Sequence, residues 1–414
     1  MKTLRRKVYV AAGSNTVSMG TGRKEFHPKK PRPGLEHYIF EAGRAVLARV
    51  GGAGHIDEGV IGNFMAGRFN NQGNLAALIP AIDEGLLWKP CSRVEGACCS
   101  GALALVAAIK SVLAESAEMV LTIGVEVQNT VKALYGADIL ATAGWSQERK
   151  AGHAYFFPGK FSDRAGACFA KYGRDETRQA MARWYRLAIE NARRCPTAQE
   201  YHNTTGDLEA QAMAEPTPET FVDHLTVFDC SMVSDGASAV AIASEAGLAR
   251  AGIATSDAVE VVAVGQVEAD LTRPPADLTR LETTARAVQQ ALEGAGITVA
   301  DLATVETHDC FTIAGILATE AIGLAAPGKG SAFVLEGNTA RTGRVPFNTT
   351  GGLIGWGHPT GGTGVRQAVT AWEQLTGKAG KYQVPLSAGR PYALSVNMGG
   401  NDKTVVAIVY KRAA

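Results

Sequence analysis

Val94-Glu95-Gly96-Ala97-Cys98-Cys99-Ser100-Gly101 joins the end of a predicted strand, Cys91 to Gly96, to the start of an apolar helix, Gly101 to Leu113. A cysteine at a helix start meets unpaired backbone N–H groups and the positive end of the helix dipole. Both favour the nucleophilic thiolate, and the N–H groups can hold a developing oxyanion. A buried cysteine beside a helix is more often a packing residue, so a catalytic Cys98 needs partners elsewhere in the chain.

Strands and helices alternate on both sides of this segment. In the first half, a strand (Lys7 to Ala12) and a helix (Glu36 to Val50) are followed by the strand-like VIGNFM and a helix over Asn71 to Glu84. Met119 to Glu126 is a continuous apolar run, as expected of a strand buried on both faces. This alternation predicts an α/β fold.

A second half begins at Val259 to Val267, another predicted strand, and repeats the pattern with helices near Thr283 to Glu293 and Gly362 to Leu375. Strands in both halves deliver reactive residues to loops and helix starts, which indicates an internal duplication. Gln128 to His224 has scattered aromatic, glycine and proline residues and few clean periods, so it is expected to be a large excursion packed over the core.

Composition narrows the class of protein. A chain of 414 residues with 46% hydrophobic residues can bury a large core, and a net charge of +1 gives no overall attraction to nucleic acid or an anionic membrane. The first apolar run is too short for a signal peptide, and no stretch reaches the roughly 20 apolar residues of a membrane span. Seven scattered cysteines indicate free thiols in a reducing compartment, and none has zinc-site spacing. We therefore expect a cytoplasmic protein without metal.

The excursion is basic between Trp145 and Cys195, where eleven Lys or Arg residues stand against five acids. Two interpretations are open: solvated helix faces, such as that of Arg178, Arg183 and Arg186, or a patch for the phosphates of a nucleotide-bearing substrate. The cations are Arg149, Lys150, Lys160, Arg164, Lys171, Arg174, Arg178, Arg183, Arg186, Arg193 and Arg194.

Two histidines stand in positions suited to chemistry. Thr307-His308-Asp309-Cys310-Phe311 places an imidazole and a thiol two residues apart at a predicted strand end, and Gly357-His358-Pro359 lies in a glycine-dense loop. A lone loop histidine is more often structural. Together with Cys98 and the turn at Gly399-Gly400, however, these residues offer a nucleophile, its base, a proton carrier and backbone donors for acyl transfer.

These motifs resemble those of thiolases. The Cys98 segment is similar to the thiolase nucleophile motif, Ser234-Asp235-Gly236-Ala237 to a characteristic mid-chain turn, Gly351 to Gly364 to the histidine loop, and Asn397-Met398-Gly399-Gly400 to the C-terminal glycine turn. Four matches in the family's order span most of the chain.

The His308-Asp309-Cys310-Phe311 motif narrows the resemblance to the sterol-carrier-protein type of thiolase. Ordinary thiolases carry Asn-Glu-Ala-Phe there and a second cysteine in the C-terminal turn, where this chain has Asn397. The resemblance therefore implies that Cys310 is the acid/base thiol. Cys99 departs from the family's small residue, and is either a spectator or a competing thiol; Ser100-Gly101 favours Cys98.

The resemblance implies a five-layered αβαβα fold of two similar βαβαβαββ halves. The expected N-terminal half is 1–127 with 225–256, the inserted loop domain is 128–224, and the C-terminal half is 257–414. It further implies at least a homodimer, and for several relatives a small zinc-ribbon/OB-fold partner subunit that would complete a heterotetramer.

The chemistry that the resemblance implies is cleavage of a 3-oxoacyl-CoA with coenzyme A as co-substrate and no bound cofactor. Cys98 would carry the acyl group, His358 would take its proton, and Cys310 would protonate the departing enolate. His308 and His358 would stabilise that enolate, while the N–H groups of Cys98 and Gly399 would hold the oxyanion.

Other functions stay open at this stage. One is a condensing acyltransferase of the ketosynthase or acylphloroglucinol-forming kind; another is a scaffold that binds acyl-CoA or a retro-aldolase partner without thiolysis. Two thiols and two histidines together favour a thiolase. The substrate stays open too: an aromatic cluster is either core or a pocket for a bulky acyl group, as in benzoylsuccinyl-CoA thiolase. Its members are Tyr135, Trp145, Tyr155, Phe156 and Phe157.

Overall fold

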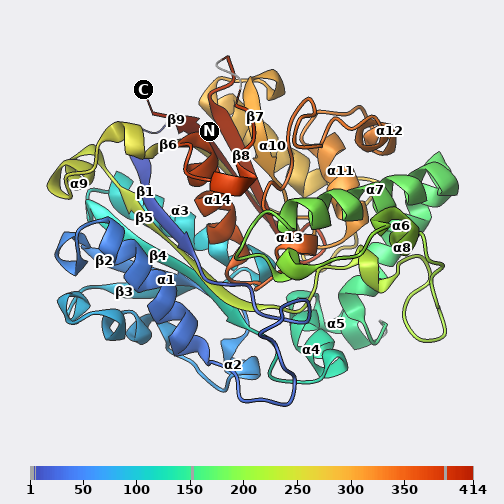
Figure 1. The fold of residues 1–414 in the computed structure, drawn as a ribbon, viewed down its shortest axis with the longest axis horizontal. Helices are drawn as coiled ribbons and strands as arrows, with labels where there is room; N and C mark the ends of the chain where they lie inside the picture. The colour runs from blue at the N-terminus through green and yellow to red at the C-terminus, as the bar shows by residue number, and fades with distance from the viewer. Residues whose placement is uncertain (1–3, 5, 151–152, 387–388, 414) are drawn as a thin grey trace.

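Strands and helices alternate through both halves of the computed structural model, which describes residues 4, 6–150, 153–386 and 389–413 (Figure 1). The strands are β1 (Val8–Asn15), β2 (Glu58–Gly62), β3 (Cys91–Val94), β4 (Met119–Val127), β5 (Asp235–Ala243), β6 (Val259–Glu268), β7 (Leu302–Glu306), β8 (Tyr392–Gly399) and β9 (Thr404–Arg412). The helices are α1 (Leu35–Arg49), α2 (Ala66–Phe69), α3 (Ser100–Leu113), α4 (Ala133–Leu140), α5 (Ser146–Lys150), α6 (Phe156–Tyr172), α7 (Arg174–Ala192), α8 (Leu208–Ala212), α9 (Glu245–Arg250), α10 (Glu282–Ala295), α11 (Thr312–Ala321), α12 (Gly330–Leu335), α13 (Gly352–Gly355) and α14 (Thr363–Leu375).

The strand order shows a duplication. The sheet runs β3-β2-β4-β5-β1-β6-β9-β8-β7, and its two halves meet where β1 pairs with β6. Outward from that junction, β1-β5-β4-β2 and β6-β9-β8-β7 have the same pattern of two antiparallel pairings followed by a parallel one. Both inner strands carry a register shift at a matching place, Val10/Ala12 and Val261/Ala263.

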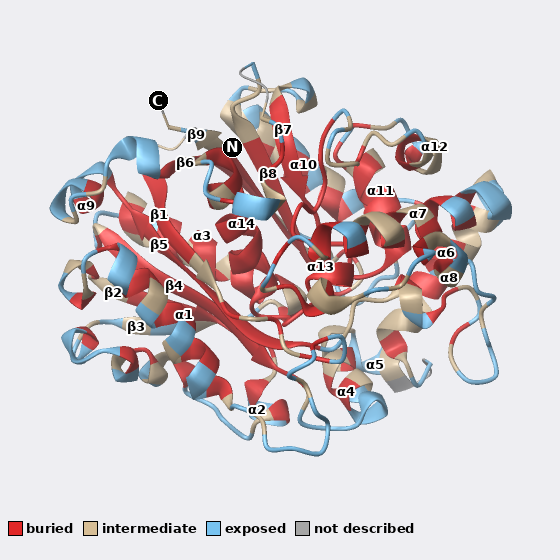
Figure 2. Cartoon of the chain, viewed as in Figure 1, coloured by how far each residue is buried: buried red, intermediate tan, exposed pale blue. Residues whose placement is uncertain are grey.

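The helices form three layers around the two half-sheets, which gives the five-layered fold expected. Helix α1 covers the outer face of the first half, α10 covers the outer face of the second, and α3 and α14 lie side by side between them (Figure 1). Most residues of both central helices are buried (Figure 2). This explains the apolar sequence of α3, whereas α14 also buries polar side chains such as Arg366 and Gln367.

Glycines let the starts of the two central helices touch. A Cβ on Gly364 would lie 2.2 Å from the backbone nitrogen of Ala102, and one on Gly101 would lie 2.9 Å from that of Gly364. No larger residue fits at this crossing. It brings the loops before α3 and α14, and hence Cys98 and His358, into one region.

Two regions differ from the sequence-based expectation. The helix expected over Asn71–Glu84 is wrong: short 3-10 turns stand there instead, because Asn74 has a positive φ of 48° and Pro80 lacks the N–H that a helix needs. The excursion, in turn, contains the two longest helices of the described chain, α6 and α7. Helix α7 packs against α11, α12 and α13, so the excursion shares a core with the second half.

In the part of the chain that the structure describes, every helix falls short of the length and apolar character required to cross a bilayer.

Candidate active site

Cys98 lies in a 3-10 turn, Ala97–Cys99, between β3 and α3. The turn is tight, since Ala97 has a positive φ of 54°, a conformation that costs an L-residue roughly 1–2 kcal/mol. Ser100 stabilises it: its hydroxyl accepts a hydrogen bond from Gly96 N (3.0 Å) and donates one to Ala97 O (2.6 Å). This turn therefore places the Cys98 thiol beyond the end of β3.

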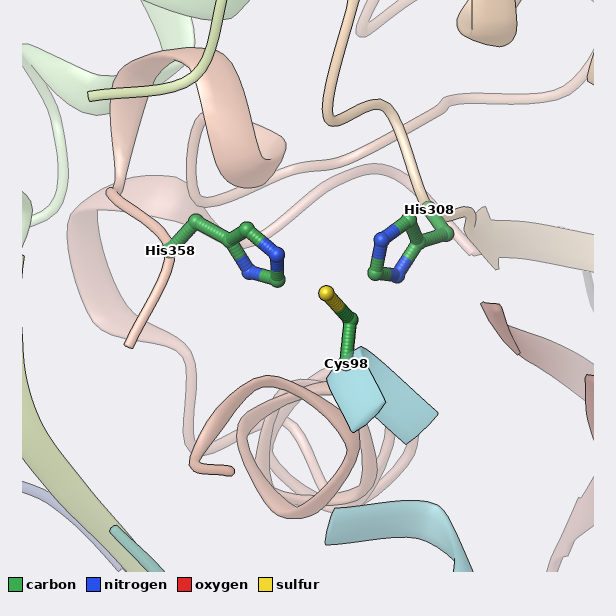
Figure 3. A group of neighbouring side chains, drawn as sticks. All are labelled: Cys98, His308 and His358. Carbon is green, nitrogen blue, oxygen red and sulfur yellow. The ribbon is translucent and has the colours of Figure 1, made fainter. Parts of the chain in front are cut away.

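Three of the predicted side chains meet at this point. Sγ of Cys98 and one ring nitrogen each of His308 and His358 all lie within 4.8 Å of one another (Figure 3). The two imidazoles are nearly perpendicular, with ring centroids 5.0 Å apart. His308 follows β7 and His358 precedes α14, so two loops of the second half meet a cysteine of the first half. Cys310 lines the same cavity.

Hydrogen bonds fix the orientation of His358. Its Nδ1 lies 2.7 Å from Oγ1 of Thr363, whose hydroxyl donates to Pro359 O at 3.2 Å. Oγ1 therefore accepts from Nδ1–H, and Nε2 is left as the basic nitrogen. That Nε2 is buried and has no protein partner, which suits a base that awaits the proton of Cys98.

The mid-chain motif holds the backbone of the same loop. Ser234 Oγ accepts from His358 N at 2.9 Å, and Gln128 Nε2 donates to His358 O at 2.7 Å. Asp235 in turn accepts from the N–H groups of Gln128 and Asn129. Sequence resemblance marked this motif without showing what it does; the structure shows that it positions the histidine loop.

Glu126 is a buried residue that the sequence analysis missed. Its carboxylate accepts hydrogen bonds from the N–H groups of Phe64, Met65 and Gly361 and from the hydroxyl of Thr360. It thereby ties the histidine loop to the first half-sheet. A carboxylate at the end of an otherwise apolar buried strand was the available signal.

His308 has its own supports. Asn397 Nδ2 lies 2.9 Å from its Nδ1. The neighbouring Asp309 accepts from Trp184 Nε1 (2.9 Å) and from Leu353 N (2.7 Å), which joins the His308 loop to α7 and α13. Both histidine loops thus depend on buried polar contacts.

Burial shifts the pKa of each reacting group toward its neutral form. Burial, and secondarily Glu126, raises the pKa of Cys98 to about 12, and burial with Cys98 and Asp309 raises the pKa of Cys310 well above its usual value. Burial and the Arg366 cation lower the pKa of His358 to about 3, and burial lowers that of His308 as well. Loss of solvation therefore opposes the thiolate that the helix start favours.

The C-terminal glycine turn supplies a backbone donor to the resting nucleophile. The N–H that bonds to the Cys98 sulfur is that of Gly400, which also lines the cavity. Gly399 lies behind the nucleophile turn, where a Cβ would meet Gly96 O at 2.4 Å. The role of Gly399 as an oxyanion donor stays a prediction.

The cavity over Cys98 has a volume of about 190 Å³ and is mostly apolar. Of the aromatic residues considered, Tyr155 and Phe157 line it, Phe156 is buried in the core, and Tyr135 and Trp145 are partly exposed. Tyr155 and Phe157 thus fit the interpretation as a pocket wall, and Phe156 fits the interpretation as core. Cys230, whose thiol the sequence analysis did not single out, lines the cavity as well.

Most of the excursion's cations are committed to partners. Arg178 is buried and pairs with Asp229 at 2.8 Å, Arg164 is fully buried, and Arg183 contacts Glu209. The interpretation as solvated helix faces is wrong for Arg178, whose guanidinium anchors α7. The side chain of Lys150 lies outside the described residues.

Cys98, His308 and His358 also offer the thiolate and imidazole donors that Zn²⁺ accepts. Sequence spacing could not reveal this trio, since its members come from three separate loops.

Two thiols, two imidazoles and a backbone donor around an apolar cavity are groups suited to acyl transfer. Residues 265–412 match the family model for the thiolase C-terminal domain. An acetyl-CoA acetyltransferase of Methanothermobacter thermautotrophicus is 35% identical over 378 residues, which cover 90% of this chain and 94% of that protein. The chain belongs to the thiolase superfamily and is an acyl-CoA C-acyltransferase.

Two other relatives differ in how much of each chain the similarity covers. The benzoylsuccinyl-CoA thiolase subunit BbsB of Thauera aromatica is 28% identical over 391 residues, 92% of each chain. Human sterol carrier protein 2 is 36% identical over 191 residues, 45% of this chain and 34% of that protein.

Solved structures agree on the fold. An Ltp2-ChsH2(DUF35) aldolase has a TM-score of 0.77 at 20% identity, covering 99% of this chain and 98% of that one. Human mitochondrial 3-ketoacyl-CoA thiolase in complex with CoA has a TM-score of 0.71 at 18% identity over the full length of both.

Proposed function

We propose that the protein catalyses thiolytic cleavage of a 3-oxoacyl-CoA by CoA, or the reverse Claisen condensation, through an acyl group on Cys98. The observation that carries the proposal is the convergence of Cys98, His308 and His358 within 4.8 Å, in a cavity that Cys310 also lines.

In cleavage, His358 Nε2 takes the proton of Cys98, and the thiolate attacks the ketone carbon of the substrate. The bond between that carbon and the α-carbon breaks, and Cys310 protonates the departing enolate to give the shortened acyl-CoA. Cys310 then recovers its proton from the thiol of CoA, whose sulfur attacks the acyl-Cys98 thioester. The bond between the acyl carbon and the Cys98 sulfur breaks, the longer acyl group leaves as its CoA thioester, and the Cys98 thiolate takes its proton back from His358. His308 and His358 stabilise the enolate, and the N–H of Cys98 with that of Gly399 holds the oxyanion.

Mass spectrometry of the intact protein after brief exposure to acetyl-CoA tests the proposal. The expected result is a mass gain of one acetyl group, located on Cys98 by fragmentation of the peptide that holds both Cys98 and Cys99, and lost again on adding CoA. Acylation of Cys99 or Cys230 in its place, or no adduct together with no CoA-dependent cleavage of acetoacetyl-CoA, would refute it.

We also propose membership in the sterol-carrier-protein type of thiolase, on the His308 to Phe311 motif and on the 36% identity to sterol carrier protein 2. A bulky or aromatic acyl group, as in benzoylsuccinyl-CoA, is the proposed substrate class. Supporting it are Tyr155 and Phe157 in the cavity wall and the similarity to BbsB.

The proposed assembly is a homodimer with a small zinc-ribbon/OB-fold partner subunit, and the proposed location is the cytoplasm. Strand β3 is an edge of the sheet, and it follows Leu87 and Trp88, which are 47% and 96% exposed; an unpaired edge beside apolar side chains favours association with a second copy. The name of the aldolase complex, which includes a DUF35 component, supports the partner.

For the domains we propose 1–127 with 225–256, 128–224 and 257–414. Strand β4 ends at Val127, β5 returns to the same half-sheet at Asp235, and β6 opens the second half at Val259.

A further inference from the structure

We propose that Asn397 and Thr363 hold the two active-site histidines in opposite tautomers, so that His358 presents a bare nitrogen to Cys98 while His308 presents an N–H to the substrate. Asn397 is then a positioning residue that makes His308 a hydrogen-bond donor. The inference deepens the proposed thiolase function and rests on it.

The hydrogen bonds on the far side of each ring differ in direction. The Thr363 hydroxyl donates its hydrogen bond to Pro359 O. Its oxygen can therefore only accept a hydrogen bond from His358 Nδ1–H. Asn397 presents its amide nitrogen to Nδ1 of His308 at 2.9 Å. An amide nitrogen only donates, so Nδ1 of His308 must be an acceptor and its ring proton must sit on Nε2.

Both rings are neutral, so the nitrogen that carries the single ring proton donates a hydrogen bond and the other nitrogen accepts one. Each imidazole is buried, and the Arg366 cation nearby opposes a second positive charge on either ring. A neutral imidazole is a base at one nitrogen and a donor at the other. Since the rings stand nearly perpendicular with centroids 5.0 Å apart, the two functions are presented to the same small volume.

Asn397 is held firmly enough to impose this choice. It lies in β8, paired with Val406 of β9, and its backbone oxygen accepts from Cys99 Sγ at 3.3 Å. Its side-chain oxygen is buried against Gly364, at the crossing of α3 and α14, and has no hydrogen-bond partner among the described residues, so packing holds the amide in place. Cys99, the residue after the nucleophile, therefore also helps to hold Asn397, the residue that orients His308.

The position of the His308 ring proton affects the rate of one step, the formation of the enolate. When CoA leaves the first acyl-CoA during acylation of Cys98, it takes the proton of Cys310. The Cys310 thiolate then accepts a proton from the α-carbon of a second acyl-CoA, negative charge builds on its thioester oxygen, and an N–H aimed at that oxygen lowers the barrier. Loss of one such donor typically slows a reaction about 10²- to 10³-fold. Acylation of Cys98 uses His358 and does not require that donor.

Asn397→Asp tests the inference, because a carboxylate accepts from Nδ1–H and draws the His308 proton away from Nε2. We expect exchange of the acetyl-CoA α-protons with deuterium in D₂O to slow about 100-fold or more, and Asn397→Ala to slow it less. Alkylation of Cys98 by iodoacetamide should stay within about threefold of the wild type in both variants. Ser395→Ala, on the same face of β8 and bonded to Tyr410 instead, is the matched control and should alter neither rate.

A spectroscopic measurement reads the tautomers directly. Two-bond ¹H–¹⁵N correlation spectra of ¹⁵N-histidine protein, assigned with His308→Gln and His358→Gln, should show the proton on Nε2 of His308 and on Nδ1 of His358, and Asn397→Asp should move the former to Nδ1. A proton on Nδ1 of wild-type His308, or equal losses of exchange and alkylation in Asn397→Asp, would overturn the inference. The spectra do not depend on turnover, so they separate this failure from an absence of Cys98 acylation, which would refute the thiolase mechanism.

Discussion

Oγ1 of Thr363 lies 2.7 Å from Nδ1 of His358, on the side of the ring turned away from Cys98. This contact decides what the imidazole does, because a proton held on Nδ1 leaves Nε2 free to accept the proton of the thiol. Thr363 is the first residue of α14 and His358 lies five positions earlier, so the start of one buried helix supplies both the base and the group that orients it.

We predict that Cys98→Ser lowers the rate of acyl transfer by several powers of ten while CoA binding largely survives, since a hydroxyl is a far weaker nucleophile in the same volume. Steady-state cleavage of acetoacetyl-CoA and calorimetric titration with CoA measure the two quantities.

Cys99→Ala is the control for this prediction. The Cys99 thiol is buried and bonded to Asn397 O, away from the cavity, so the variant should keep Cys98 acylation within a few-fold of the wild type. Near-normal turnover by Cys98→Ser would contradict the mechanism.

The pH dependence of the nucleophile follows from the two shifted pKa values. With the pKa of Cys98 raised to about 12 and that of His358 lowered to about 3, both groups are neutral near pH 7 in the free enzyme, and the proton moves to His358 only as the thiol attacks the substrate. Alkylation of Cys98 by iodoacetamide, which requires thiolate, should therefore keep rising from pH 6 to 10 without a plateau. A plateau below pH 8 would show a preformed ion pair.

Arg366 and Glu306 form a buried ion pair, 3.0 Å apart, beneath the two histidines. We predict that Arg366→Met destabilises the protein by about 3–5 kcal/mol, because the Glu306 carboxylate would stay buried without its partner. Urea denaturation measures the loss. In the exposed pair of Arg286 with Glu282, Arg286→Met should change the free energy of unfolding far less, because water solvates both charges. Equal losses in both variants would contradict the importance of the buried pair.

Helix α4 presents small residues to the cavity, among them Ala137. We predict that Ala137→Leu lowers kcat/KM for a 3-oxoacyl-CoA bearing a phenyl group about tenfold or more relative to acetoacetyl-CoA, since extra methylenes crowd a cavity of about 190 Å³. Leu134→Ala, on the exposed side of the same helix, should leave the ratio unchanged. An equal loss for both substrates would place Ala137 outside the acyl site.

Local sequence predicted much of the fold and the principal side chains of the site. The apolar run of β4 and the helix starts at α3 and α14 follow from periodicity and glycine placement. The helix predicted over Asn71–Glu84 was wrong. Apolar spacing alone favours a helix there, but Pro80 and the left-handed Asn74 interrupt it.

Sequence by itself determined which chemistry is available: two thiols and two imidazoles at strand ends and helix starts, in the order typical of thiolases. Only the tertiary structure decided their protonation and orientation. Burial pushes each group to its neutral form, and the contacts that choose a tautomer, Thr363 to His358 and Asn397 to His308, depend on the packing of α3 against α14 and of β8 against its neighbours. Solvation and hydrogen-bond direction are properties of a folded environment, which no local pattern of residues encodes.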